Sequence, residues 1–246
     1  MLVHGATADH TAWRTAGPLL AGDHAIYAID RRGRGASGDT LPYGIAREYE
    51  DVAAVVDDVA RQTGQPVDVV GHSYGGRVGL GAALLTTHLR RLVVYEGAPS
   101  PDQRPFQRPG VLAELEALAA RDDRPGLLSA FMTSIVGMTQ AELAAFRASP
   151  TWPLRVAAAP TVIRELQTES AEEAGSARFA DVRIPVLQLA GGDSPAAFIE
   201  GTLALDQILA HGRVVILAGQ KHAAHHTDPV RFVAEIRRFL DATTEP

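Results

Sequence analysis

The stretch from Pro66 to Leu80, PVDVVGHSYGGRVGL, constrains the fold of this chain more than any other. Val67–Val70 is mostly apolar and β-branched, which predicts a short buried strand, and the Ala-rich run Val78–Leu85 predicts a helix. The segment between them, Gly71–Gly76, is short and rich in glycine. A strand that reverses into a helix over so few residues needs a very tight turn, and glycines leave room for the two elements to pass close together.

Ser73 stands at the apex of this turn, in the pattern Gly71-His-Ser-Tyr-Gly75. A serine held in such a turn has a strained backbone and a hydroxyl pushed out of the turn, the geometry called a nucleophile elbow. The same letters also fit a glycine-rich turn that contains an incidental serine. The flanking buried strand and helix favour the nucleophile.

Composition limits the class of protein. With 246 residues, of which 46% are hydrophobic and 21% charged, the chain can form one soluble globular domain with a full core. The net charge of −6 disfavours a nucleic-acid or anionic-membrane binder, and the absence of cysteine excludes disulfides and thiolate metal sites. No apolar run reaches the roughly 18 residues of a membrane span, and no secretory signal precedes the first strand. We therefore expect a cytoplasmic protein.

Strands and helices are predicted to alternate along most of the chain. The expected strands are Leu2–Val3, His24–Ile29, Val67–Val70, Leu92–Tyr95, Ile184–Leu189 and Val214–Leu217. The expected helices are Thr11–Leu20, Gly44–Thr63, Val78–Leu85, Ala196–Ala210 and a last one that begins at Asp228-Pro229. Short connections between strands and helices indicate a mostly parallel sheet with helices on both faces, which is a three-layer α/β/α fold.

The alternation stops between residues 99 and 180, within what we predict to be a single domain over residues 1–246. Four prolines interrupt the chain from Pro99 to Pro109, and only helical patterns follow from Val111 to about Glu172. Leucine, phenylalanine and methionine form one apolar stripe between Leu127 and Val136. We expect this helical insertion to cap the sheet and to roof a pocket for an uncharged, fairly apolar substrate.

Polar residues follow four of the predicted strands: Ser73, Glu96, Asp193 and His222. Functional residues of an open α/β sheet lie at the carboxyl ends of its strands, so these side chains are candidates for one site. Serine needs an adjacent imidazole to take its proton, and the imidazole needs a carboxylate to fix its tautomer. Either Asp193 or Glu96 could supply that carboxylate.

Several segments together match a known pattern: His4-Gly5, Asp30–Ser37, Gly71–Gly76, Gly192-Asp193 and His222. They resemble the α/β-hydrolase fold family over nearly the whole chain. The likeness is greatest to its small bacterial esterase-like and haloperoxidase-like members that carry a helical cap, and the cap is the least similar part.

The resemblance implies a role for each matching residue. Ser73 would be the nucleophile, His222 the base and Asp193 the orienting acid, while backbone N–H groups of Ala6 and Tyr74 would form the oxyanion hole. Some members of the family carry their acid after the strand that follows the nucleophile helix. Glu96 occupies that position and is the alternative acid.

The chain departs from the family pattern in two places. Lys221 precedes the histidine where the family usually has glycine, and we interpret it as a solvated loop residue. The family also opens with two antiparallel strands that are missing here, so either the start site is assigned too far downstream or the hairpin is lost. Its loss would leave the strand at 25–29 as an exposed sheet edge.

Two further patterns are weaker alternatives. Gly33–Gly38 spells G-x-G-x-x-G after a strand, but a dinucleotide site needs a helix to start there, and Asp39–Pro42 follows instead. His222, His225 and His226 with Asp228 could be taken for a metal cluster, but the glutamate of H-E-x-x-H is missing.

The sequence thus predicts a serine hydrolase that cleaves a small, fairly apolar ester through an acyl-enzyme. We expect no cofactor, no metal, no nucleic-acid partner and no membrane partner, and the oligomeric state, monomer or homodimer, stays open. The same triad could instead run perhydrolysis, C–C cleavage or a lyase reaction, or the scaffold could be a non-catalytic ligand receptor.

Overall fold

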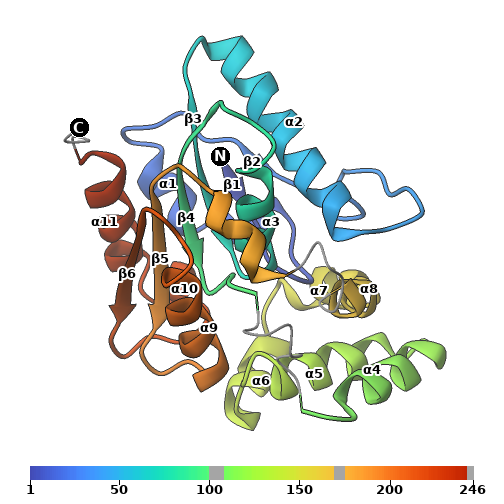
Figure 1. Cartoon of the computed structure of the whole chain (residues 1–246). Helices are drawn as coiled ribbons and strands as arrows, with labels where there is room; N and C mark the ends of the chain where they lie inside the picture. The colour runs from blue at the N-terminus through green and yellow to red at the C-terminus, as the bar shows by residue number, and fades with distance from the viewer. Residues whose placement is uncertain (100–107, 169–174, 243–246) are drawn as a thin grey trace.

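A parallel sheet of six strands forms the centre of the molecule (Figure 1). The computed structural model describes residues 1–99, 108–168 and 175–242. The strands are β1 (Leu2–Val3), β2 (Ala28–Ile29), β3 (Val67–His72), β4 (Leu89–Tyr95), β5 (Val186–Gly191) and β6 (Gly212–Leu217). They lie in the order β2-β1-β3-β4-β5-β6, and each pair of neighbours is parallel. The predicted α/β fold and its parallel sheet are confirmed.

The N-terminal edge of the sheet is shorter than predicted. Only Ala28–Ile29 of the expected strand His24–Ile29 pairs with β1, because β1 itself offers only two residues as partners. β2 ends the sheet on this side. β4 and β6 instead begin earlier than predicted, at Leu89 and Gly212.

Helices cover both faces of the sheet. One face carries α2 (Ile45–Thr63), α3 (Tyr74–Ala82) and α9 (Ala196–Asp206), and the other carries α1 (Ala16–Leu20), α10 (Ala224–Thr227) and α11 (Pro229–Leu240). Two apolar clusters, one on each face, bury the strand side chains that alternate between the faces. The fold is therefore the predicted three-layer arrangement.

The capping of two helices tests the sequence patterns directly. Asp228 accepts a hydrogen bond from the Arg231 N–H at 3.2 Å, as predicted for the start of the last helix. The predicted helix Thr11–Leu20 is instead a 3₁₀ turn, η1 (His10–Trp13), followed by α1. The N-cap of η1 is Asp9, whose carboxylate accepts from the Thr11 N–H at 2.8 Å.

Between β4 and β5 the described residues form five α-helices, which we call the helical insertion: α4 (Val111–Ala120), α5 (Arg124–Ser134), α6 (Gln140–Arg147), α7 (Trp152–Ala158) and α8 (Thr161–Gln167). Figure 1 shows them beyond the carboxyl ends of the strands. They share an apolar core of their own, which also contacts Ala6 of the sheet domain. Pro101 and Pro105 of the predicted linker, and residues 169–174, lie outside the described residues. A short 3₁₀ helix, η5 (Ser176–Asp181), leads back to β5.

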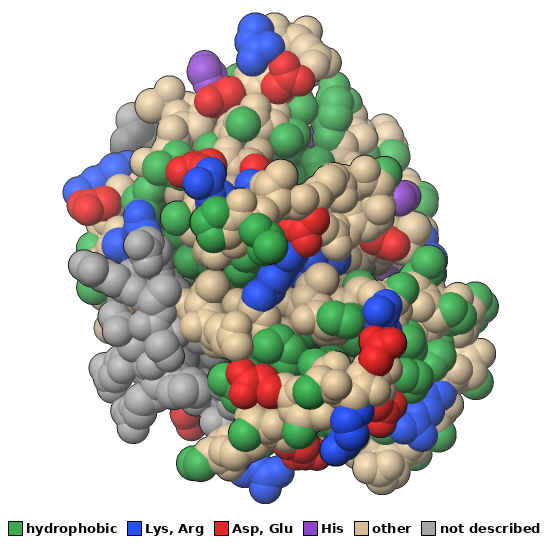
Figure 2. Space-filling model, turned by 90° about the vertical axis from the view of Figure 1, so that its right-hand side faces the viewer, with side chains coloured by type: hydrophobic (Ala, Val, Ile, Leu, Met, Phe, Trp, Pro, Cys, Tyr) green, Lys and Arg blue, Asp and Glu red, His purple; other side chains and the backbone are tan. Residues whose placement is uncertain are grey.

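The surface carries charges of both signs. On the face shown in Figure 2, acidic and basic side chains are interspersed, so this face offers no continuous basic surface to a polyanion. Within the described residues, no helix has the length and apolar character needed to cross a membrane.

Candidate active site

Ser73 occupies the sharp turn between β3 and α3. Its backbone has φ 53° and ψ −127°, a left-handed conformation that non-glycine residues rarely adopt. The turn is held in place because the Ser73 N–H donates to the carbonyl oxygen of Tyr95 at 2.8 Å. The predicted elbow is therefore present, and α3 begins directly after it at Tyr74 rather than at Val78.

Glycines make this turn possible. A Cβ at Gly75 would lie 2.4 Å from the carbonyl oxygens of His4 and Val3, and one at Gly71 would lie 2.5 Å from the oxygen of Gly75. These atoms belong to the backbone and cannot move aside, so both positions need a residue without a side chain. The close approach brings the loop after β1 against the start of α3.

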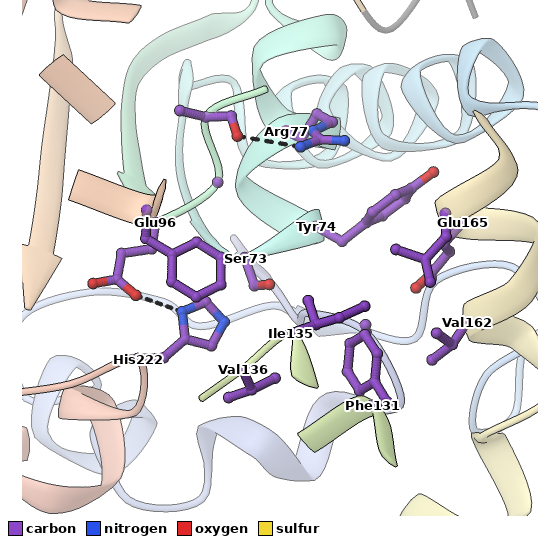
Figure 3. A pocket seen from close by; sticks show the side chains of 15 residues that line it. Ser73, Tyr74, Arg77, Glu96, Phe131, Ile135, Val136, Val162, Glu165 and His222 are labelled. Atoms are coloured by element: carbon purple, nitrogen blue, oxygen red, sulfur yellow. Dashed lines mark hydrogen bonds and ion pairs between the residues drawn. The ribbon is translucent and has the colours of Figure 1, made fainter. Parts of the chain in front are cut away.

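The acidic partner of His222 is Glu96. Its carboxylate oxygen Oε2 lies 2.5 Å from Nδ1 of His222 (Figure 3). Its other oxygen, Oε1, accepts the Gly191 N–H at 2.6 Å. Glu96 is buried and has φ 46°, so the backbone bends sharply where β4 ends. A carboxylate on Nδ1 leaves Nε2 as the ring nitrogen that can accept a proton.

Asp193 does not occupy the position predicted for it. Its side chain is exposed, and its N–H donates to the carbonyl oxygen of Gln220 at 2.9 Å. In the described parts of the chain its carboxylate makes no hydrogen bond or ion pair with His222. The expectation that Asp193 orients the imidazole is corrected in favour of Glu96, because Asp193 lies two residues beyond β5, on a turn that faces solvent.

The loop that carries His222 is held by two buried side chains. Nε2 of His72 donates to the carbonyl oxygen of His222 at 2.8 Å. The Tyr95 hydroxyl donates to the Lys221 carbonyl and accepts the Ala224 N–H at 2.9 Å. His72 is the last residue of β3, which leads into the elbow, and Tyr95 is the last residue of the neighbouring strand β4. The same two strands therefore position the loop and the elbow.

Phe198 completes the setting of the imidazole. Its ring stacks on the His222 ring, with centroids 4.6 Å apart and planes inclined by 9°. Neither Phe198 nor Tyr95 is marked by any local sequence pattern. Only the chain reversal after β5, which returns α9 to this edge, brings Phe198 to the site.

His4 organises the turn that carries the predicted oxyanion donor. Its Nδ1–H donates to the Gly5 carbonyl at 2.9 Å, and its Nε2 accepts the Arg31 N–H at 3.0 Å. Burial, followed by the nearby Arg31 charge, holds the pKa of His4 well below its usual range, so the ring is neutral. This arrangement fixes the His4-Gly5 turn and places Ala6 beside Ser73, where both line the same cavities.

Tyr74 presents its backbone N–H at the start of α3. As the first residue of the helix it has no intrahelical acceptor for that N–H, which leaves the donor for a ligand. Its hydroxyl lies 3.0 Å from that of Tyr43 and 3.0 Å from that of Thr168. The side chain therefore points away from Ser73 toward α2 and α8, as Figure 3 shows.

A buried ionic cluster links this region to the helical insertion. Glu165 of α8 accepts from both Arg31 and Arg34, and Glu48 of α2 lies 3.0 Å from Nε of Arg31. Burial acts against the Arg31 charge, but Glu48 and Glu165 outweigh it and raise the pKa of Arg31. The sequence patterns did not reveal this cluster, because its members are 134 residues apart (Arg31 and Glu165).

Two cavities meet at Ser73 and His222. The smaller, of about 50 Å³, lies under the helical insertion. Its lining includes the apolar side chains of Phe131, Ile135 and Val162 and the charged residues Arg77, Glu96 and Glu165 (Figure 3). The larger, of about 240 Å³, is also lined by Met138 and Phe146 and by two arginines, Arg14 and Arg155. The predicted apolar stripe thus lies over the candidate nucleophile, although α5 ends at Ser134 and Ile135 follows it.

The weaker patterns form neither of the sites that they resemble. Gly33–Gly38 is a loop in which the Ala36 N–H donates to the Asp30 carboxylate at 2.9 Å, and the next helix begins only at Ile45. No group of three or more His, Cys, Asp or Glu arranged for a metal ion occurs among residues 1–99, 108–168 and 175–242. Lys221 pairs with Glu142 of α6 at 2.7 Å, and both side chains are exposed.

Known proteins share this fold. The chain is 32% identical to an alpha/beta hydrolase from Sphaerobacter thermophilus DSM 20745, with a TM-score of 0.81 and coverage of 97% of this chain and 91% of the other. An esterase, RhEst1 from Rhodococcus sp. ECU1013, is 24% identical with a TM-score of 0.71, and the match covers 98% and 89% of the two chains.

A curated relative extends the comparison. It carries the name "Putative carbamate hydrolase RutD", comes from Pseudomonas savastanoi pv. phaseolicola (strain 1448A / Race 6), and is 26% identical over 238 residues, which are 92% of this chain and 86% of the relative. A model of the alpha/beta hydrolase family matches residues 1–236. Fold, elbow and family match agree, and the chain belongs to the alpha/beta hydrolase family.

Proposed function

We propose that the protein is a serine hydrolase that cleaves a small ester through an acyl-enzyme. The observation that carries this proposal is the pair formed by Glu96 and His222 beside Ser73. A nucleophile on a strained turn, an imidazole and a buried carboxylate are the groups that acyl transfer from serine requires. Membership of a hydrolase family supports the same class of reaction.

Ser73, His222 and Glu96 each have a defined role in the proposed reaction. Ser73 Oγ attacks the carbonyl carbon while Nε2 of His222 removes its proton, and Glu96 stabilises the imidazolium that results. The imidazolium then gives the proton to the leaving alcohol as the C–O bond breaks. Water attacks the acyl-enzyme by the same route, which releases the acid and restores the Ser73 hydroxyl.

The backbone N–H groups of Ala6 and Tyr74 are the proposed oxyanion donors. Both residues line the smaller cavity together with Ser73. The charge that develops on the carbonyl oxygen needs donors that are already in place, and the His4 hydrogen bonds and the first turn of α3 hold these two.

The cavities favour a substrate with one small half. A volume of about 50 Å³ holds only a few non-hydrogen atoms, given that a single water needs roughly 10–15 Å³ on this scale. Its wall of Phe131, Ile135 and Val162 accepts an apolar group such as a short acyl chain. Acetate and propionate esters are therefore the first substrates to test.

A fluorophosphonate probe tests the proposal. Folded wild-type protein should be labelled on Ser73, and short 4-nitrophenyl esters should be hydrolysed. Ser73→Ala should abolish labelling and lower kcat by on the order of 10⁶ if the three side chains act as a unit. Absence of labelling in folded wild-type protein would refute the serine mechanism, whereas labelling without ester turnover would point to non-hydrolytic chemistry.

A further inference from the structure

The larger cavity is lined by apolar side chains and by a basic cluster. Phe131, Met132, Val136, Met138 and Phe146 form the apolar wall. Arg14, Arg155 and His226 line the same cavity and lie near one another, and Ser149 and Thr151 also line it. An apolar pocket with a few convergent polar groups is the usual form of a small-molecule site, and here the convergent groups are basic.

Arg155 is the central group of this basic cluster. It comes from α7 and is half-buried above the turn that carries Ala6. One of its terminal nitrogens donates to the Ala6 carbonyl at 3.3 Å and reaches the Thr7 hydroxyl at 3.5 Å. Among the described residues it forms no ion pair, unlike Arg31, Arg34 and Arg164. The remaining donors of the guanidinium are thus available to a ligand in the cavity.

The surroundings of Arg155 leave a net positive charge. Arg14 lies on the same side, while Asp9 is the nearby acid, and its carboxylate already accepts from the Thr11 N–H at 2.8 Å. Burial, opposed by Asp9 and reinforced by Arg14, lowers the pKa of Arg155 to about 10, so the group remains charged near pH 7.

His226 adds a neutral donor or acceptor beside the two arginines. Burial, Arg14 and Arg155 lower its pKa to about 4, and its Nδ1 lies 3.2 Å from the Thr15 hydroxyl.

An unpaired arginine that is partly removed from water costs free energy unless a ligand compensates it. A planar guanidinium matches the geometry of a carboxylate, which it binds through two parallel hydrogen bonds.

We propose that the larger cavity binds a carboxylate on the larger half of the ester substrate, held by Arg155 while the apolar wall packs against the carbon skeleton. This inference rests on the proposed function, since Ser73 and His222 line the same cavity. It replaces the expectation of a wholly uncharged substrate: one half is small and apolar, and the other is amphipathic and anionic.

Pairs of esters that differ only in charge test the inference. One pair is 3-acetoxybenzoate and 3-acetoxybenzamide, in which the alcohol half carries the test group. The other is monomethyl adipate and methyl adipamate, in which the acyl half carries it. In at least one pair the carboxylate should be preferred by about tenfold to a hundredfold in kcat/KM, the worth of a charge-assisted hydrogen bond.

The preference should depend on Arg155. In Arg155→Leu the ratio of the two kcat/KM values should fall to about one, and Arg155→Lys should recover part of it. The ratio is measured rather than either rate, because Arg155 also contacts Ala6 and its loss can change both rates. Arg124→Leu is the matched control, since Arg124 lies on α5, pairs with Asp122 and lines neither cavity.

Calorimetry separates this inference from the proposed function. Wild-type protein should bind 3-hydroxybenzoate more tightly than 3-hydroxybenzamide, or Ser73→Ala should bind monomethyl adipate more tightly than methyl adipamate, and adding Arg155→Leu should remove the difference. Equal rates and equal affinities within both pairs, or a preference that persists in Arg155→Leu, would overturn the carboxylate site. Absence of hydrolysis with an Arg155-dependent preference in binding would refute the serine hydrolase and leave the site standing.

Discussion

The carboxylate of Glu96 lies 2.5 Å from Nδ1 of His222 and also accepts the N–H of Gly191, the last residue of β5. The imidazole is thereby tied to the strand next to β4. The bond fixes the tautomer in which Nε2 is free to accept a proton, and it places the negative charge where an imidazolium would need it.

The first prediction compares the two candidate acids. Glu96→Gln should lower kcat for a short ester by about 10⁴, the loss seen when the acid of such a triad becomes an amide. Asp193→Asn should stay within about twofold of wild type, because the Asp193 side chain is exposed and Glu96 is the carboxylate that contacts the imidazole of His222. Loss of activity in Asp193→Asn, with Glu96→Gln active, would show that the acid is assigned wrongly here.

The glycines of the elbow give a second prediction. Gly75→Ala would place a Cβ 2.4 Å from two backbone oxygens, so the start of α3 must shift away from the His4-Gly5 turn. We expect a loss of stability of at least 2 kcal/mol or so, since overpacking against rigid atoms costs roughly 1–3 kcal/mol or more. Urea denaturation measures it.

Gly38→Ala is the control for that substitution. Nothing lies within 4 Å of a Cβ built at Gly38, and its φ is not in the left-handed region. Its free energy of unfolding should stay within about 0.5 kcal/mol of wild type. Equal stability of the two variants would show that α3 does not pack as closely on β1 as the structure has it.

The third prediction concerns the ionic cluster under the helical insertion. Glu165→Gln removes the charge that Arg31 and Arg34 share, and both guanidinium groups are buried. Breaking a buried pair from one side typically costs about 3–5 kcal/mol, because a charge is left uncompensated. Denaturation with urea should therefore show a large decrease in the free energy of unfolding for Glu165→Gln.

An exposed pair serves as the comparison. Asp122→Asn removes the partner of Arg124, and both side chains are largely in water. Such a pair contributes about 0–1 kcal/mol, and asparagine tolerates the φ of 52° found at this position. If Glu165→Gln is no less stable than Asp122→Asn, the cluster does not hold α8 against the sheet domain.

The elbow and the sheet could be predicted because their signals are local. Four residues of β3, the glycines around Ser73 and the apolar face of α2 each lie within one short window of sequence. Their periods and spacings follow directly from strand and helix geometry. The order of the strands and the position of the insertion follow from connection rules that use the same elements.

The acid could not be chosen in the same way. Glu96 and Asp193 both follow strands that end at one edge of the sheet, and their spacing from His222 permits either. The choice depends on the backbone at each site: φ 46° turns the Glu96 side chain inward, whereas the Asp193 N–H donates to Gln220 and the side chain faces water. Arg155 and Glu165 escaped notice for a related reason, since their partners are far away in sequence.

The last prediction follows from four histidines kept neutral inside the fold. Burial is the largest cause that lowers the pKa of His4, His72 and His225 well below 6.5, and that of His226 to about 4. Between pH 6.5 and pH 4 the unfolded chain binds protons that the folded protein does not. Stability must therefore fall as the pH drops through this window.

The expected loss of stability is large. Each such histidine lowers the free energy of unfolding by about 1.4 kcal/mol for each pH unit below 6.5. Three or four of them together therefore remove about 4–5 kcal/mol of it between pH 7 and pH 5.5. His226 contributes least, because it is only half-buried. Carboxylates with lowered pKa values, such as Asp30 and Glu142, add their losses only nearer pH 4 and below.

Urea denaturation at pH 7.5, 6.5 and 5.5 measures this slope. His226→Gln should make the slope shallower by up to about a quarter, since it removes one of the four groups. A free energy of unfolding that stays constant from pH 7.5 to 5.5 would contradict the neutral, buried state of these rings. It would also remove the explanation for how His72 holds the His222 loop with a single defined tautomer.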